Sequence, residues 1–324
     1  MRYNLSFILL FSFLFGKAQE TKPFPVDTSF TLHSAYQKEL KYYPFIKPVY
    51  PVVPDSIEVK KDLVYAKYDN REMHIDLYSP KTLDEPRPAI LFVFGGGWRS
   101  GNKIMEAPMA IHFAELGYVT ATVEYRLSTE ALYPAAVFDI KTAIRWLRKN
   151  ATELHINTNK IVISGTSAGG QLAALVASTN NSGMYFDSTF YPEFSGNVQA
   201  AIDIDGVLAF IHPESGEGAD KPGKPSAATY WFGGNKDEKA KLWNEASALN
   251  HANENMPPIL FINSQHPRFH AGRDDMIRIL DSLGIYSEVH TLPDTPHPFW
   301  LFTPWFDPSV KWMEEFLGKN SFQP

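Results

Sequence analysis

The segment Gly165-Thr166-Ser167-Ala168-Gly169 has the clearest capacity for chemistry in this sequence, because it matches the pattern G-x-S-x-G. It follows an apolar run at 161–163 and precedes a predicted helix over 169–177. A serine on a tight turn between a strand and a helix exposes its hydroxyl, and the flanking glycines leave room where the two elements approach. A capping serine or a phosphate cradle are the alternatives, but no lysine follows as a P-loop requires. The pattern predicts that Ser167 is a nucleophile.

A glycine triplet, Gly95-Gly96-Gly97, follows another predicted buried strand over 89–94. Glycines allow close approach of the backbone to a reacting group, so Gly95 and Gly96 can present main-chain N–H donors. The N–H of Ala168, at the start of a helix, can point the same way. We predict that Gly95, Gly96 and Ala168 stabilise a developing oxyanion.

His297, in Pro296-His297-Pro298, is the predicted general base. When nucleophile, acid and base occur in that order along the chain, the histidine follows the last strand, which is predicted here over 287–292. His290 lies within that strand and is predicted to be structural.

The acid that would orient His297 is harder to assign. The loop after the predicted strand 259–263 holds no carboxylate until Asp274 and Asp275, where the next helix begins. Asp205 ends the preceding strand, and a triad is defined by roles rather than by positions. We predict Asp274 as the acid, with Asp205 or Asp275 as alternatives; a helix cap for Asp274 and a turn for Asp205 are the structural readings.

These residues require an α/β framework to bring them together. Strands are predicted over 63–68, 73–78, 89–94, 118–123, 161–163, 200–204, 259–263 and 287–292. Helices are predicted over 107–116, 134–149, 169–177, 274–283 and 308–317. Such alternation predicts one α/β domain over 57–324, with a mostly parallel sheet covered by helices on both faces. Residues 211–256 are expected to form an irregular cap insertion, and the Pro- and Tyr-rich residues 19–56 an extended strap.

The chain resembles the carbohydrate-esterase branch of the α/β-hydrolases, near the feruloyl and acetyl-xylan esterases of gut and soil bacteria. The resemblance covers roughly residues 63–302 and rests on Gly95-Gly96-Gly97-Trp98 with Gly101, Glu124-Tyr125-Arg126-Leu127, Pro134 with Asp139, Gly165-Thr166-Ser167-Ala168-Gly169-Gly170 and Thr295-Pro296-His297. It implies the α/β-hydrolase fold, ester hydrolysis and an HGGG-type oxyanion loop. Phe94 departs from this pattern, because family members usually have histidine there.

The loop before Asp274 also carries Arg268, His270 and Arg273. Arginine binds carboxylates in a bidentate manner, so these residues predict a substrate that bears carboxylates, such as a uronic-acid polysaccharide of the pectin kind. Trp98 and Trp300 are predicted to contact the substrate, since aromatic rings line many ligand pockets. The alternatives are arginines paired with the neighbouring aspartates and aromatic rings packed in the core.

Residues 1–18 have the character of a signal peptide: Arg2, an apolar run over 5–15, and small residues at Gly16 and Ala18. The run is too short to span a bilayer, although an uncleaved anchor or a buried helix is the alternative. We expect a mature chain beginning at Gln19, secreted or periplasmic, with no membrane span after the signal is removed.

Composition excludes several classes of function. The 36 acidic and 30 basic residues give a net charge of −6 without a basic run, which argues against nucleic-acid binding. The absence of cysteine excludes disulfides, thiolate metal sites and a cysteine nucleophile. His266 and His270 are separated by Pro267 and do not predict a metal site, so no metal and no other cofactor is expected.

The expected activity is therefore that of a serine carboxylic ester hydrolase acting on acyl or methyl esters of plant or algal polysaccharide. Two alternatives stay open. One is an exported serine peptidase or formamidase of the same fold, and the other is a hydrolase-like binding module without catalysis.

Overall fold

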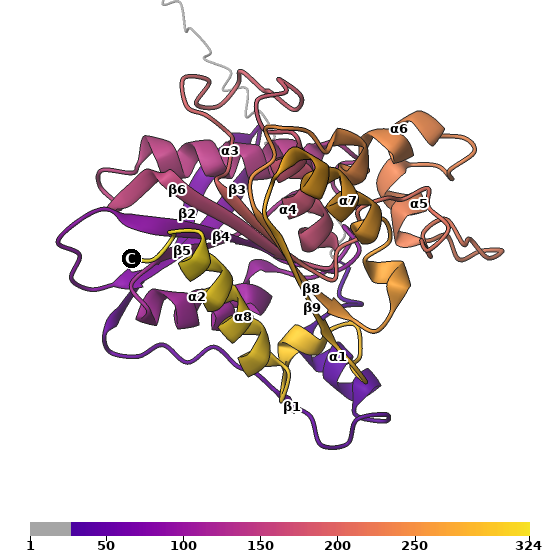
Figure 1. Cartoon of the computed structure of the whole chain (residues 1–324), viewed down its shortest axis with the longest axis horizontal. Helices are drawn as coiled ribbons and strands as arrows, with labels where there is room; N and C mark the ends of the chain where they lie inside the picture. The colour runs from indigo at the N-terminus through magenta and orange to yellow at the C-terminus, as the bar shows by residue number, and fades with distance from the viewer. Residues whose placement is uncertain (1–26) are drawn as a thin grey trace, which may run out of the picture.

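A computed structural model describes residues 27–324 and shows one central sheet between two layers of helices (Figure 1). The predicted signal peptide at 1–18 and the first residues of the strap lie outside the described residues. The sheet has eight strands in the order β2-β3-β5-β4-β6-β7-β8-β9. In sequence order they are β2 (Ile57–Tyr68), β3 (Arg71–Pro80), β4 (Arg87–Val93), β5 (Val119–Val123), β6 (Ile156–Thr166), β7 (Ala200–Ile204), β8 (Ile259–Ser264) and β9 (Ser287–Leu292).

The pairing of these strands confirms the predicted fold class. β3 pairs antiparallel with both β2 and β5, and every pairing from β5 to β9 is parallel. The parallel strands β4, β5 and β7 are buried almost throughout because both of their faces are covered.

Neighbouring residues of one strand supply two separate cores. Leu91 and Val93 of β4 pack beneath α3 (Ala135–Lys149), α4 (Ala168–Ser178) and α7 (Arg273–Leu283). Ile90 and Phe92 pack on the other face, beneath α2 (Ala107–Glu115) and α8 (Phe306–Lys319). This alternation follows from the two-residue period of a strand. None of the helices in the described part of the chain is long and apolar enough to cross a membrane.

The N-terminal strap differs from the expectation of an extended segment, because it contains the helix α1 (Leu32–Glu39). Thr31 and Ser34 form a capping box that satisfies the first backbone N–H groups of this helix. After α1, the short strand β1 (Lys47–Pro48) pairs with β10 (Phe302–Thr303), which lies close after His297 in the sequence. Tyr43 packs edge-on against Trp305, with ring centroids 5.3 Å apart.

The predicted cap insertion at 211–256 is more ordered than expected. It contains the short helices α5 (Ala227–Phe232) and α6 (Ala240–Glu245) and the 3-10 turn η2 (Ala248–His251). Trp231, Phe232 and Trp243 are buried there and pack together with Phe210. Aromatic burial explains why this segment is fixed without long regular elements.

Candidate active site

Ser167 occupies a sharp turn between β6 and α4, with φ 51° and ψ −118°. A side chain at Gly165 would place its Cβ 2.1 Å from the carbonyl oxygen of Gly169, and one at Gly169 would meet the carbonyl oxygen of Val93 at 2.0 Å. Both positions therefore require glycine. The strained left-handed backbone of Ser167 is held by these close contacts, as in a nucleophile elbow.

A chain of hydrogen bonds connects Ser167, His297 and Asp205. The Oγ of Ser167 lies 2.8 Å from Nε2 of His297, and Nδ1 of His297 lies 2.7 Å from Oδ2 of Asp205. The structure thus brings the predicted nucleophile and base together. Serine, imidazole and carboxylate in this order have the geometry of a catalytic triad.

The prediction of Asp274 as the acid is wrong. Its carboxylate pairs with Arg273 at 2.8 Å and is 62% exposed, away from His297. Asp275 is not the acid either, because it pairs with His212 at 3.1 Å and with Arg278. The physical reason lies in the loop between β8 and α7, because α7 begins only at Arg273. The residue of this loop that contacts His297 is Phe269, and the centroids of the two stacked rings are 3.4 Å apart.

Ser264, at the end of β8, holds Asp205 in place. Its backbone N–H donates to Oδ1 of Asp205 at 2.9 Å, and its hydroxyl donates to Oδ2 at 2.6 Å. This residue was not predicted from the sequence, although the signal was available: the strand ends on a hydroxyl side chain and no carboxylate follows in the next loop. With His297, these donors satisfy a carboxylate that is fully buried.

The surroundings of His297 favour its neutral form. Burial lowers the pKa of His297 below its usual 6.5, although the hydrogen bond to Asp205 acts in the opposite direction. A neutral imidazole can accept the proton of Ser167. Trp300 packs edge-on behind the same ring, with centroids 5.2 Å apart.

Main-chain N–H groups line the cavity beside Ser167. Gly96, Gly97 and Ala168 belong to the lining, and within residues 27–324 no hydrogen bond occupies their N–H groups. Gly95, which was also predicted as a donor, does not belong to the lining: it is pressed against the elbow, where a Cβ would meet the carbonyl oxygen of Thr166 at 2.7 Å and the Cβ of Ser167 at 2.9 Å. Its place in the lining is taken by Gly97.

Phe94 supports the glycine loop by stacking. Its ring lies 4.4 Å from that of Tyr125 with 21° between the planes, and the hydroxyl of Tyr125 donates to the Phe94 carbonyl at 2.9 Å. The departure from histidine at this position is thus compensated by an aromatic pair.

The cavity around Ser167 and His297 has a volume of about 620 Å³ and is walled in part by the strap. Residues from 29 to 39 supply one side, and residues of the 216–227 segment supply another. Besides Asp205 and His297, the ionisable side chains in the lining are the cations of Lys38, Lys221 and Arg268 and the carboxylates of Glu39 and Glu217. Sequence reasoning did not place any of these five except Arg268 at the site.

Of the predicted substrate-binding residues, some line the cavity and others do not. Arg268 and Trp98 line the cavity, although the ring of Trp98 is buried and stacks on Trp231 at 4.8 Å. His270, Arg273 and Trp300 lie outside the lining. His270 is buried, Arg273 donates to Oδ1 of Asn263 at 2.8 Å, and Trp300 packs in the core behind His297.

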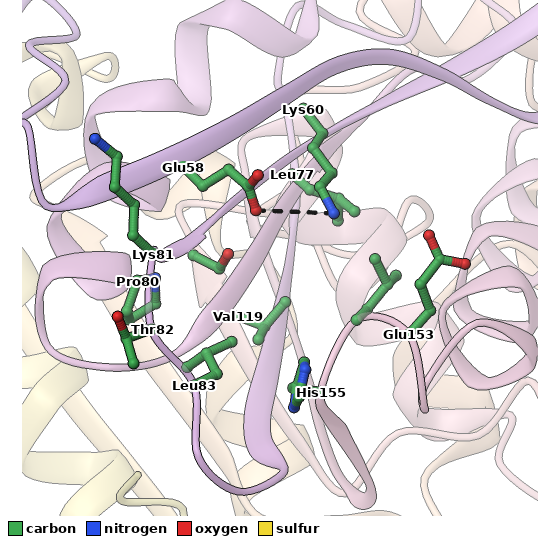
Figure 2. Close-up of a pocket in the computed structure, with 12 residues that line it drawn as sticks. Glu58, Lys60, Leu77, Pro80, Lys81, Thr82, Leu83, Val119, Glu153 and His155 are labelled. Atoms are coloured by element: carbon green, nitrogen blue, oxygen red, sulfur yellow. Dashed lines mark ion pairs between the residues drawn. The ribbon is translucent and has the colours of Figure 1, made fainter.

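Another cavity, of about 350 Å³, lies at the ends of the strands opposite to those that carry Ser167 (Figure 2). Val119, at the start of β5, and His155, just before β6, belong to its lining, so it opens at the amino ends of the parallel strands. Lys60 and Glu58 form a 3.8 Å ion pair there. Ligands of open α/β sheets bind at the carboxyl ends of the strands, which is where Ser167 and His297 lie.

Comparison with known proteins agrees with this geometry. The BD-FAE family model matches residues 75–284. Esterase LipC of Mycobacterium tuberculosis is 26% identical over 217 residues, which cover 65% of this chain and 50% of LipC. The probable carboxylic ester hydrolase LipM of the same organism is 35% identical over 155 residues, covering 46% of this chain and 35% of LipM. The chain therefore spans half or less of the length of these two relatives.

Solved structures match over most of the chain. The apo form of Thermogutta terrifontis esterase 2 is 25% identical with a TM-score of 0.69, covering 85% of this chain and 98% of that one. A truncated carbohydrate esterase from gut microbiota shares the fold at 22% identity and a TM-score of 0.68, covering 83% of this chain and 99% of that one. With the elbow, the hydrogen-bonded Ser167–His297–Asp205 chain and a family match over 75–284, the chain belongs to the BD-FAE family of α/β-hydrolase fold.

Proposed function

We propose that the protein is a serine carboxylic ester hydrolase. The observation that carries this proposal is the hydrogen-bonded chain from Ser167 through His297 to Asp205, which opens into a cavity lined by Gly96, Gly97 and Ala168, whose main-chain N–H groups are bonded to no other described residue. Acyl transfer needs a nucleophile, a base and donors for an oxyanion, and all three meet at this point.

In this mechanism, Oγ of Ser167 attacks the carbonyl carbon of the ester while Nε2 of His297 takes the serine proton. The N–H groups of Gly96, Gly97 and Ala168 donate to the oxygen that becomes negative. When the tetrahedral intermediate collapses, the bond to the alcohol breaks and His297 returns the proton to the leaving oxygen. Water then attacks the acyl-enzyme with His297 as base, and the carboxylic acid leaves Ser167 free.

Hydrolysis of p-nitrophenyl acetate tests this function. We expect Ser167→Ala to lower kcat by at least about 10³-fold, since the covalent route is lost. The matched control is Ser282→Ala on the exposed side of α7, which should retain wild-type turnover. Equal activity of wild type and Ser167→Ala would refute the proposal, and so would a folded wild-type protein that cleaves no ester.

We further propose that the ester is carried by a polysaccharide with acidic sugar residues. Apart from Asp205, which is hydrogen-bonded to His297, three cations and two carboxylates line the cavity. One carboxylate, Glu39, pairs with Lys38 at 3.1 Å, and burial raises the pKa of the other, Glu217. Arg268 is exposed and forms no ion pair within the described residues, so its guanidinium is available to a substrate carboxylate.

Arg268→Ala tests this choice of substrate. We expect KM for an acetylated or methylated oligogalacturonide to rise about tenfold, whereas KM for p-nitrophenyl acetate changes less than twofold. Arg278→Ala, an exposed arginine on α7, is the matched control. A similar change in KM for both esters would exclude a carboxylate-binding role for Arg268.

We also propose that the protein is exported, on the strength of the signal-like residues 1–18. Expression of the full sequence in a bacterium and mass measurement of the product should give a chain beginning at Gln19. An intact Met1 in the cytoplasmic fraction would contradict export.

A further inference from the structure

A cavity of about 310 Å³ lies between α3 and the loop that follows α4. Two cations of α3, Lys141 and Arg145, line it together with residues of the 179–197 segment. Their spacing of four residues puts both on the same side of the helix. α4 begins at the elbow and runs for 11 residues, so its C-terminal end at this cavity is roughly 16 Å from Ser167.

Both cations are buried, and within residues 27–324 the carboxylate of Asp187 attracts Arg145 only from beyond ion-pair distance. The exposed fraction is 5% for Lys141 and 2% for Arg145. Lys141 Nζ donates to the carbonyl of Thr179 at 3.2 Å, and Arg145 donates to the carbonyls of Lys141 and Asp187. Nη2 of Arg145 has no hydrogen-bond partner in the described part of the chain. Neither cation forms an ion pair with a carboxylate within residues 27–324.

Two like charges in such a place are costly, because burial penalises each ion and they repel one another. Burial, with the charge of Arg145, accordingly lowers the pKa of Lys141 to about 8. A bound anion would supply the missing partner for both groups and for the unpaired Nη2.

The rest of the lining fits an anion attached to a ring. Phe186 is 58% exposed, and the guanidinium of Arg145 lies over its ring at 5.5 Å from the centroid. Sugar rings pack against exposed aromatic faces, and a forked guanidinium binds a planar carboxylate. Glu193, at the exposed rim, is the one carboxylate in the lining.

We propose that this cavity binds an oxyanion, and that the carboxylate of an acidic sugar residue packed against Phe186 is its occupant. Such a site would hold a glycan at a point separate from the ester-cleaving cavity. It does not depend on the proposed hydrolytic activity, because it is measured by binding alone.

Isothermal titration calorimetry of the full chain tests the site with D-galacturonate, D-galactose and inorganic phosphate. We expect galacturonate to bind and galactose not to bind. Arg145→Met should weaken galacturonate binding at least tenfold, since a charge-assisted pair is lost. Lys149→Met, which removes an exposed cation from the same helix, is the matched control and should leave the affinity unchanged.

Two exposed variants keep the test decisive if Arg145→Met does not fold. Glu193→Gln should tighten galacturonate binding by removing a like charge, and Phe186→Ala should weaken galacturonate but not phosphate. Equal binding of galactose and galacturonate would overturn the proposal. If Arg268→Ala abolishes galacturonate binding and Arg145→Met leaves it unchanged, the ligand binds in the Ser167 cavity, and the proposal is overturned as well. If phosphate binds as tightly as galacturonate, and Phe186→Ala weakens the binding of neither, the sugar is not the occupant and the proposal is overturned.

Discussion

Asp205 is fully buried, yet its carboxylate receives hydrogen bonds from the backbone and the hydroxyl of Ser264 and from His297. These donors compensate the loss of water around the charge. The same bonds fix the direction of the carboxylate, so His297 is held with Nε2 toward Ser167. The residue that orients the base is thus itself oriented by the end of the neighbouring strand.

Asp205→Asn is therefore expected to lower kcat by about 10³-fold or more. The neutral amide cannot hold the imidazole in the same tautomer, and it does not stabilise the imidazolium that forms when His297 takes the serine proton. Asp274→Asn is the control and should stay within twofold of wild type, since Asp274 faces solvent. Hydrolysis of p-nitrophenyl acetate measures both. If Asp274→Asn lowered kcat more than Asp205→Asn did, the acid of the triad would be Asp274 at the start of α7.

The pH dependence follows from the lowered pKa of His297. The neutral imidazole is the active form, so kcat/KM should rise with pH through the pKa and then level off. Because burial lowers that pKa, the midpoint of the rise should lie below pH 6.5. A pH profile of kcat/KM measures it, and a midpoint above pH 7 would contradict this expectation.

At the scale of elements, the strap forms part of the cleft. Residues of α1 line the cavity, and the segment after α1 is fixed by β1–β10 pairing and by the contact of Tyr43 with Trp305. None of these residues belongs to the hydrogen-bonded chain at Ser167. Loss of the strap should consequently affect substrate binding more than the chemical step.

Tyr43→Ala tests this division of roles. An edge-on aromatic pair contributes about 1 kcal/mol, so we expect KM to rise about fivefold while kcat stays within twofold. Tyr50→Ala removes an exposed aromatic side chain of the same segment and serves as the control. Steady-state kinetics with p-nitrophenyl butyrate distinguish the outcomes. A loss confined to kcat would show that the strap acts on the catalytic residues.

Elements with a strong apolar period were predictable from the sequence, and those fixed by contacts across the chain were not. The strands β7 and β9 agree with their predicted bounds, and the elbow was recognised because its glycines are a local requirement. The helix α1 was missed, since it has only eight residues and is held against the domain by contacts with residues distant in the sequence, such as those of Ala35 in the core. The acid was misassigned because sequence order does not show that the loop after β8 turns Phe269, and not a carboxylate, toward His297.

At the scale of the whole molecule, one sheet joins two cores. Ile90 and Leu91 are adjacent in β4, are both fully buried, and belong to opposite faces. Because the same strands border both cores, loosening one face should weaken the other. The protein is expected to unfold as one cooperative unit.

Urea unfolding of Leu91→Ala and Ile90→Ala tests this cooperativity. Each substitution leaves a cavity and should lower the free energy of unfolding by about 2–5 kcal/mol. Both should shift one and the same transition, followed by tryptophan fluorescence and by circular dichroism. Two separate transitions, of which each variant moves only one, would show that the cores unfold independently.

The pairing of β1 with β10 joins residue 47 to residue 303, close to the two ends of the chain. A chain that is still being synthesised contains Ser167 and Asp205 long before His297 and β10 have left the ribosome. The pairing of β1 with β10 and the packing of Tyr43 on Trp305 cannot form until that moment, although Asp27 of the strap can already pair with Arg99. A product that lacks residues from 297 onward would have neither the base nor the strand that pairs with β1, and we expect it to cleave no ester even if its sheet had formed.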